Sequence, residues 1–340
     1  MISIALCACF VQSKLSVEPI VYFEKNGAIY RRQGSSSSHL VAGRGTLPSV
    51  SADGKYIAYL DNRYVCVQKS NADHPFFNQR VLPDSSGNHS YDKRFFPDWL
   101  PDDKSLLVSK CDIVKLSFES GLPPAATFSF PSERHVWSIY RVPIPGRGQL
   151  LYPPEILFGP NTSGPAAYGL TSTAAPAISP SGKFICFCRN GDLWFAEAGE
   201  TDGFVTRSPS WSEQRLAANA NHEGGTGGSN ETTFISRISW SPSGNLLAVS
   251  SDRYSGSGEA LVEIYRLKTA GKAYATVKKV TSFIGANATF YSESSVLFNS
   301  MYITEDSGIW KIDIKTGRKH LWLSGAKNAS VCIKGVTSQE

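Results

Sequence analysis

The residues best placed to do chemistry in this sequence are polar side chains that recur directly after short apolar segments. They are Asp61, Arg63, Lys110, Asp112, Arg189, Asp252 and Arg253, with His89 and His135 in long polar segments nearby. A set of mixed charges can bind a polar ligand, whereas any single member can equally be a solvated turn residue. We predict that together they form a binding surface, and we assign none of them a catalytic role.

The short motifs that accompany common enzyme chemistries are missing from the sequence. There is no zinc-protease helix signature, Walker loop, dinucleotide fingerprint or Cys-x-x-Cys pair, and Ser257 lacks the leading glycine of a nucleophile elbow. The six histidines share no metal-ligand spacing. We therefore predict that the chain is not an enzyme and that it carries no metal and no cofactor.

Cys186 and Cys188 are two residues apart, so in a strand their side chains would point to the same face. They could bind a metal or pair there, or they could be small core residues beside Phe184 and Phe187, which is the interpretation we favour. The sequence contains seven cysteines, and an odd number in so long a chain does not describe a disulfide scaffold.

A repeated segment organises the chain that must position these side chains. It consists of a short strand, a turn, a second apolar strand and then a strand with a central aromatic residue. Four clear copies and a degenerate fifth lie at residues 48–60, 97–108, 176–187, 238–249 and 288–298. In the intact turns proline fixes φ, Asp or Ser binds its own backbone, and glycine takes the positive-φ position, which together close a tight hairpin.

The third-strand and fourth-strand positions each recur six times, so each unit has four strands. The first unit begins at its second strand, and residues 329–334 form an apolar segment left over after the sixth. Pairing that segment beside residues 21–23 would close a ring and remove its exposed sheet edges. The predicted fold class is therefore all-β: a six-bladed β-propeller of four-stranded antiparallel blades, closed by a C-terminal strand.

The turn sequence Ser179-Pro180-Ser181-Gly182-Lys183, followed by an apolar and then an aromatic strand, resembles the PD40 (WD40-like) repeat of TolB-like propellers. The resemblance covers roughly residues 19 to 334 and departs from TolB in having no α/β domain ahead of the propeller. It implies a binding or scaffold protein of the bacterial envelope, which would be periplasmic or secreted. A cytoplasmic location is the alternative.

Long segments of the predicted propeller gather on one face, opposite the short glycine turns. They are the insertion 110–136, the stretch 252–261 and the linkers 83–96, 159–175 and 218–236. We predict a non-catalytic binding propeller that holds a protein, peptide or glycan at this long-loop face and at the channel mouth. The alternatives are a hydrolase or lyase with its active site in the channel, and a regulatory propeller separated from a catalytic domain. Acids and a histidine converging on a deep channel would favour the enzyme.

Residues 1–16 form an apolar run followed by polar residues, so they are either a leader or a buried first strand, and residues 17–340 are assigned to the propeller. Within that run Leu6-Cys7-Ala8-Cys9 loosely resembles a lipobox, with Cys9 as the lipid anchor. The net charge of +5 is scattered along the chain, which argues against nucleic acid as a partner. No segment is long enough to span a membrane, and we predict a monomer.

Overall fold

The computed structural model describes residues 18–81, 95–115, 133–145, 155–158, 173–189, 191–197, 199–201, 204–206, 214–217, 234–252, 260–270, 274–300 and 307–332. In these ranges every regular element is a β-strand and none is a helix. The search for a helix long and apolar enough to cross a membrane accordingly finds none in the described part of the chain.

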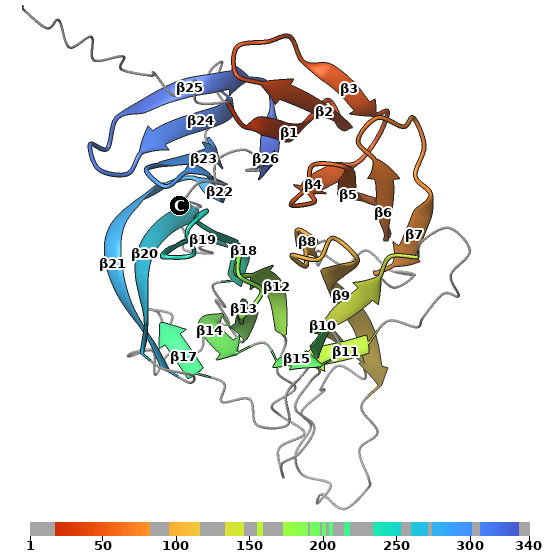
Figure 1. The fold of residues 1–340 in the computed structure, drawn as a ribbon, viewed down its shortest axis with the longest axis vertical. Coiled ribbons are helices and arrows are strands. Elements are labelled where there is room, and N and C mark those ends of the chain that lie inside the picture. The colour runs from red at the N-terminus through yellow and green to blue at the C-terminus, as the bar shows by residue number, and fades with distance from the viewer. Residues whose placement is uncertain are drawn as a thin grey trace, which may run out of the picture.

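Six four-stranded antiparallel sheets surround a central channel, as the predicted six-bladed propeller requires (Figure 1). Blades 1 to 3, each written from the innermost strand outward, contain β26 (Lys327–Cys332), β1 (Ile20–Lys25), β2 (Ala28–Gln33) and β3 (His39–Ala42); β4 (Thr46–Val50), β5 (Tyr56–Asp61), β6 (Tyr64–Lys69) and β7 (Phe77–Arg80); and β8 (Asp98–Trp99), β9 (Ser105–Lys115), β10 (Glu133–Pro143) and β11 (Glu155–Phe158).

Blades 4 to 6 repeat the same order. They contain β12 (Thr173–Ile178), β13 (Phe184–Arg189), β14 (Asp192–Glu197) and β17 (Gln214–Ala217); β18 (Phe234–Trp240), β19 (Leu246–Asp252), β20 (Leu261–Ala270) and β21 (Tyr274–Ile284); and β22 (Ala286–Ser292), β23 (Ser295–Asn299), β24 (Gly308–Asp313) and β25 (Lys319–Ser324). A separate hairpin of β15 (Gly199–Thr201) and β16 (Phe204–Thr206) lies between β14 and β17 in sequence.

The predicted ring closure is confirmed. The C-terminal strand β26 pairs antiparallel with β1, with Cys332 opposite Ile20 and Val331 opposite Val21. The strand begins at Lys327, two residues before the predicted start at 329, and residues 333 and 334 lie outside the described part of the chain. The first blade is thus built from both ends of the described chain. Its strand β1 has no unpaired edge where the ring closes.

The recurrent turn works as its composition predicts. The Ser51 hydroxyl accepts a hydrogen bond from Tyr56 N at 3.0 Å, and Ser179 and Ser241 do the same for Phe184 and Leu246 at 3.1 Å. Each serine therefore ties the start of its turn to the start of the second strand. At the fourth position of the intact turns φ is positive, as at Gly54 with 71°, which glycine adopts without strain.

Neighbouring blades are joined by apolar packing and by side chains that reach across. One shared core contains Val262 and Ile264 of blade 5 together with Phe290 and Phe298 of blade 6. The indole N–H of Trp99 donates to Ser49 O of the preceding blade at 3.0 Å, and that of Trp240 donates to Ala177 O at 3.1 Å. These contacts fix the inner strands, and through them the shape of the channel.

One predicted loop is in fact partly strand. The insertion placed at 110–136 begins and ends with an extension of the β9–β10 hairpin, which pairs Lys110 with Ser138 and continues to Lys115 opposite Glu133. Sequence reasoning missed the extension because the next turn signal, at Leu122-Pro123-Pro124, stands several residues beyond the end of β9. A turn motif sets strand length only when it lies close to the strand end.

Candidate functional site

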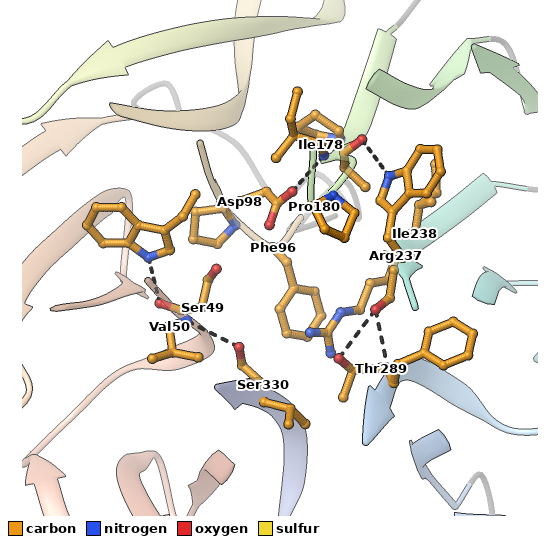
Figure 2. A pocket seen from close by; sticks show the side chains of 18 of the residues that line it. Ser49, Val50, Phe96, Asp98, Ile178, Pro180, Arg237, Ile238, Thr289 and Ser330 are labelled. Atoms are coloured by element: carbon orange, nitrogen blue, oxygen red, sulfur yellow. Dashed lines mark hydrogen bonds between the residues drawn. The ribbon is translucent and has the colours of Figure 1, made fainter. Parts of the chain in front are cut away.

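A cavity of about 340 Å³ occupies the channel and is lined by residues from all six inner strands (Figure 2). It also touches Ala52, Pro101, Pro180 and Pro242, which belong to the turns between first and second strands. The cavity therefore lies toward the short-turn end of the channel. Its wall combines proline and aromatic side chains with the hydroxyls of Ser49, Ser239, Thr289 and Ser330.

Asp98 supplies a carboxyl group to this cavity. Its Oδ2 atom accepts a hydrogen bond from Ile178 N of the next blade at 2.8 Å, which holds the group against the channel wall. Burial raises the pKa of Asp98 to about 7, against the opposing effects of the Ile178 N–H and the charge of Arg237. A carboxyl with this pKa is half protonated near neutral pH and can both accept and donate a proton.

Arg237, on β18, supplies a guanidinium to the same cavity and is only 7% exposed. Its Nη1 atom donates to Ala329 O at 2.6 Å and to Asn287 O at 3.1 Å, and the group lies 3.7 Å from the centre of the Phe96 ring. Burial lowers the pKa of Arg237 to about 9, and the charge of Asp98 opposes this shift. The side chain therefore stays cationic at neutral pH.

The hydroxyl groups around the cavity are partly used to hold neighbouring blades together. The innermost strand of a blade has a free edge, and its N–H groups need acceptors from the next blade. Ser330 Oγ accepts from Val50 N at 3.2 Å, and the hydroxyls of Ser239 and Thr289 lie 3.4 Å apart. Asp98 occupies the same kind of position, so the fold fixes its orientation in the way that it fixes these hydroxyls.

The search for metal sites finds no group of three or more His, Cys, Asp or Glu side chains among the described residues. The residues lining the channel cavity include no histidine. Cys186 and Cys188 are buried within an apolar core that also contains Leu193 and Phe195, as the core interpretation predicts. The functional groups that line the cavity are thus the Asp98 carboxyl, the Arg237 guanidinium, the Cys332 thiol and several hydroxyls.

The predicted binding residues that the structure describes lie at the other end of the strands. Asp61 accepts a hydrogen bond from Arg44 Nε at 2.8 Å in an exposed ion pair. Lys110 lies over the Tyr140 ring, and the Arg189 guanidinium lies within about 5 Å of the centres of the Phe187 and Trp194 rings. Arg63 accepts through its backbone carbonyl from Val81 N. None of these residues lines the channel cavity.

The remaining predicted residues are described in part or not at all. Backbone pairing places Asp112 opposite Val136 and His135 opposite Ile113 in the extended hairpin, and Asp252 ends β19. His89, Arg253, Cys9 and the proposed leader lie outside the described residues. The long-loop binding surface therefore stays a prediction. The backbone places Lys110, Asp112 and His135 on the β9–β10 hairpin, and Asp61 and Arg63 on the β5–β6 hairpin.

Sequence reasoning missed Asp98 and Arg237. Asp98 stands at the first-strand position of the repeat copy at residues 97–108, where no functional role was predicted, and Arg237 directly precedes the copy that begins at Ile238. A signal was present, because the positions equivalent to Asp98 in three other copies are Ser49, Ala177 and Ser239. A carboxylate that replaces small neutral residues on an inner strand has only the channel to face.

A second cavity of about 360 Å³ lies at the long-loop end of blades 6 and 1, where it is lined in part by Glu24, Asn299 and Lys327. Glu24 is 4% exposed and is fully engaged: it pairs with Lys327 Nζ at 3.1 Å and accepts from Asn328 Nδ2 at 2.8 Å and from the Thr46 hydroxyl. Asn328 Oδ1 in turn accepts from Asn299 Nδ2 at 2.9 Å. This polar network joins blades 6, 1 and 2 at the ring closure.

No family model matches the chain, and no curated protein matches it. Solved propellers resemble it across most of its length. The Cps50 (Swd1) β-propeller of Myceliophthora thermophila is 12% identical, covering 90% of this chain and 83% of that one, with a TM-score of 0.50. A protein described as TolB from Agrobacterium tumefaciens is 16% identical, covering 92% of each, with a TM-score of 0.47. The periplasmic gluconolactonase of Pseudomonas aeruginosa is 11% identical, covering 93% and 99%, with a TM-score of 0.48.

The prediction of a non-catalytic binding propeller, and with it the prediction that the chain is not an enzyme, is wrong by these comparisons. Several of the solved propellers that resemble it are enzymes by name, including an oligogalacturonate lyase, the gluconolactonase and two proteins assigned as 6-phosphogluconolactonases. At 11–13% identity to these four the likeness shows the fold alone, so mechanism has to be argued from the channel.

Proposed function

We propose that the chain is a hydrolase or lyase whose active site is the channel cavity at the short-turn end. The observation that carries this proposal is the convergence of the Asp98 carboxyl and the Arg237 guanidinium on one cavity. A proton-transferring group and a fixed cation facing the same space are what both reaction types need. A cavity of about 340 Å³ can hold a small ligand, in the size range of known small-molecule sites.

Asp98 is the proposed acid–base residue. In hydrolysis its ionised form would take a proton from a water molecule as the water oxygen attacks the substrate carbon, and would then return that proton to the departing oxygen. In elimination it would take a proton from carbon while the neighbouring carbon–oxygen bond breaks and a double bond forms, and it would then pass that proton to the departing oxygen, which leaves as a hydroxyl group. A pKa of about 7 suits both roles because each form is populated near neutral pH.

Arg237 is the proposed stabiliser of developing negative charge. Its Nη1 atom is held by two backbone carbonyls and its face by the Phe96 ring, so its position is set before a ligand arrives. A fixed cation of this kind costs no reorganisation during the reaction, and such preorganised groups supply about 3–4 kcal/mol of transition-state stabilisation in known enzymes.

The test is turnover of a panel of lactones, esters, glycosides and β-eliminating sugar acids by the full chain and by Asp98→Asn. The variant keeps an oxygen acceptor for Ile178 N and removes the titrating group. We expect at least one substrate class to be turned over by the native chain and to lose at least about 100-fold in kcat in the variant. Turnover equal in both proteins would refute the role of Asp98.

A periplasmic or secreted location and membership of the PD40 family are further proposals, and both rest on the sequence. The apolar run within residues 1–16 supports export, and the turn motif at residues 179–183 supports the family. Sequencing the N-terminus of the protein from fractionated cells tests export, because a cleaved leader would leave a new N-terminus near residue 17. A protein, peptide or glycan partner at the long-loop face is a separate proposal for the same fractions.

A further inference from the structure

Arg237 is a buried charge for which the described residues provide no counter-ion in contact. It is 7% exposed, yet no described carboxylate forms an ion pair with it, and its hydrogen bonds are to the carbonyls of Asn287 and Ala329. Asp98 influences it only through space. A buried cation without a paired anion is costly to keep folded, so this arrangement calls for a negative charge supplied from outside.

The geometry leaves one edge of the guanidinium available. Both printed hydrogen bonds use Nη1, and the Phe96 ring covers one face at 3.7 Å. The donors on Nη2 and Nε are not bonded to any described protein atom, and Arg237 belongs to the cavity lining. A carboxylate fits two such donors, because its two oxygens match the planar fork of a guanidinium.

The remainder of the cavity indicates the body of the ligand. Hydroxyls of Ser49, Ser239, Thr289 and Ser330 line it beside the flat surfaces of Pro97 and Phe96. A polyhydroxylated ligand would exchange hydrogen bonds with the hydroxyls and place its C–H groups against the apolar surfaces. A carboxylate attached to such a body is a sugar acid.

We propose that the channel cavity binds a sugar acid, whose carboxylate pairs with the Nη2 and Nε edge of Arg237 and whose hydroxyl groups face the serine and threonine side chains. This inference rests on the proposed function and narrows its substrate class. It gives Arg237 the role of ground-state anchor in addition to that of charge stabiliser. With its carboxylate bound to Arg237, the ligand would have the carbon next to that carboxylate inside the cavity, which Asp98 also lines.

The test is calorimetric binding of D-gluconate to the full chain, compared with sorbitol, which carries CH₂OH in place of the carboxylate. We expect gluconate to bind at least tenfold more tightly than sorbitol. Arg237→Met should lose at least tenfold in gluconate affinity with sorbitol binding unchanged, and Arg237→Lys should lie between the two. Arg32→Met is the matched control, since the Arg32 guanidinium also lies over an aromatic ring, that of Trp322, but is outside this cavity.

Equal binding of gluconate and sorbitol by the native chain would overturn the proposal without any variant, so a folding defect in Arg237→Met cannot hide the answer. Inorganic phosphate that binds as tightly as gluconate would overturn the sugar-acid class and leave a general anion site. Gluconate preference with no turnover of any substrate would sustain this site and refute the proposed function. Asp98-dependent turnover of neutral substrates, without a preference for gluconate, would sustain the proposed function and overturn the sugar-acid site.

Discussion

The two ends of the channel treat buried charge in opposite ways. At the long-loop end, Glu24 is 4% exposed and is bound by Lys327, Asn328 and the Thr46 hydroxyl. At the short-turn end, Arg237 is 7% exposed and its bonded neighbours are backbone carbonyls, while Asp98 is bonded to a backbone N–H. At the long-loop end the charge of Glu24 is compensated by neighbouring side chains. At the short-turn end Arg237 and Asp98 line a cavity and form no ion pair in contact.

This difference separates a structural role from a functional one. A satisfied network such as that of Glu24 strengthens the ring closure but has little left to offer a ligand. Charges that lack a partner side chain destabilise the fold slightly and interact strongly with whatever enters. The contrast explains why the short-turn end is the better candidate for chemistry, although the long loops lie at the other end.

The largest expected effect is on turnover and should separate the two ends completely. Asp98→Asn should lower kcat by at least about 100-fold because it removes the proton-transfer group. Glu24→Gln should leave kcat within about threefold, because Glu24 lies in the network at the opposite end of the channel. Steady-state rates on the same substrate provide the measurement. An equal loss in both variants would show that the two ends are not functionally distinct.

The second expected effect is on stability and should be confined to the closure network. Asn328→Ala removes its side-chain bonds to Glu24, Asn287 and Asn299 and should lower the free energy of unfolding by about 2–4 kcal/mol. Asn328 has φ of 57°, so Asn328→Gly should be less harmful by about 1 kcal/mol. Chemical denaturation measures both. Variants as stable as the native chain would mean that the network does not hold the ring.

The third expected effect is a dependence of folding stability on pH that comes from Asp98 alone. Its pKa is about 7 when folded, above the ordinary aspartate value near 4, so the folded state holds a proton that the unfolded state has lost between these pH values. The contribution of this group to the free energy of unfolding is therefore fully present below about pH 4, and it is lost as the pH rises from there through about 7. Asp98→Asn should match the native chain near pH 4 and exceed it at pH 8 by about 1–2 kcal/mol.

Denaturation curves across this pH range decide the point, with Glu24→Gln as the comparison variant. A difference between Asp98→Asn and the native chain that stays constant with pH would contradict the burial of an ionisable carboxyl in the channel. The pH at which that difference levels off also gives the folded pKa of Asp98 without a substrate.

The smallest expected effect concerns the contacts that set the channel shape. Trp99→Phe and Trp240→Phe each remove an indole N–H that bonds a carbonyl of the preceding blade, and each should cost about 1–2 kcal/mol. Trp99 lies next to Asp98, so Trp99→Phe should also change kcat, whereas Trp240 adjoins Ser239 and should affect binding more than kcat. Indistinguishable kinetics in the two variants would argue against positioning of Asp98 by its own blade.

The fold was predictable because its signals are local. The turns around Gly54, Gly182 and Gly244 fix where their hairpins close, and the third-strand and fourth-strand positions, which each recur six times, give the number of blades. Closure by β26 followed from the physical cost of leaving β1 with an open edge. The β9–β10 extension was not predictable in this way, because nothing near Lys115 marks the end of the strand.

The candidate site was not predictable from the same signals. Asp98 and Ile178 are 80 residues apart, and Arg237 and Ala329 are 92 apart, and they meet only because the ring brings the inner strands together. Long segments drew attention to the other face, where Asp61 and Lys110 already have partners. Loop length predicts where a surface is variable, whereas an unpaired charge is visible only once the burial of each side chain is known.

The most direct test of the contrast between the two ends is titration of Asp98 by carboxyl ¹³C NMR of the full chain, with its resonance assigned by its absence from Asp98→Asn. We expect a midpoint near pH 7, because this half-buried carboxyl is desolvated by the channel wall and has no cation in contact. A midpoint near the ordinary aspartate value of about 4 would mean that the group is either well solvated or well paired. That result would contradict the assignment of the short-turn cavity as an acid–base site.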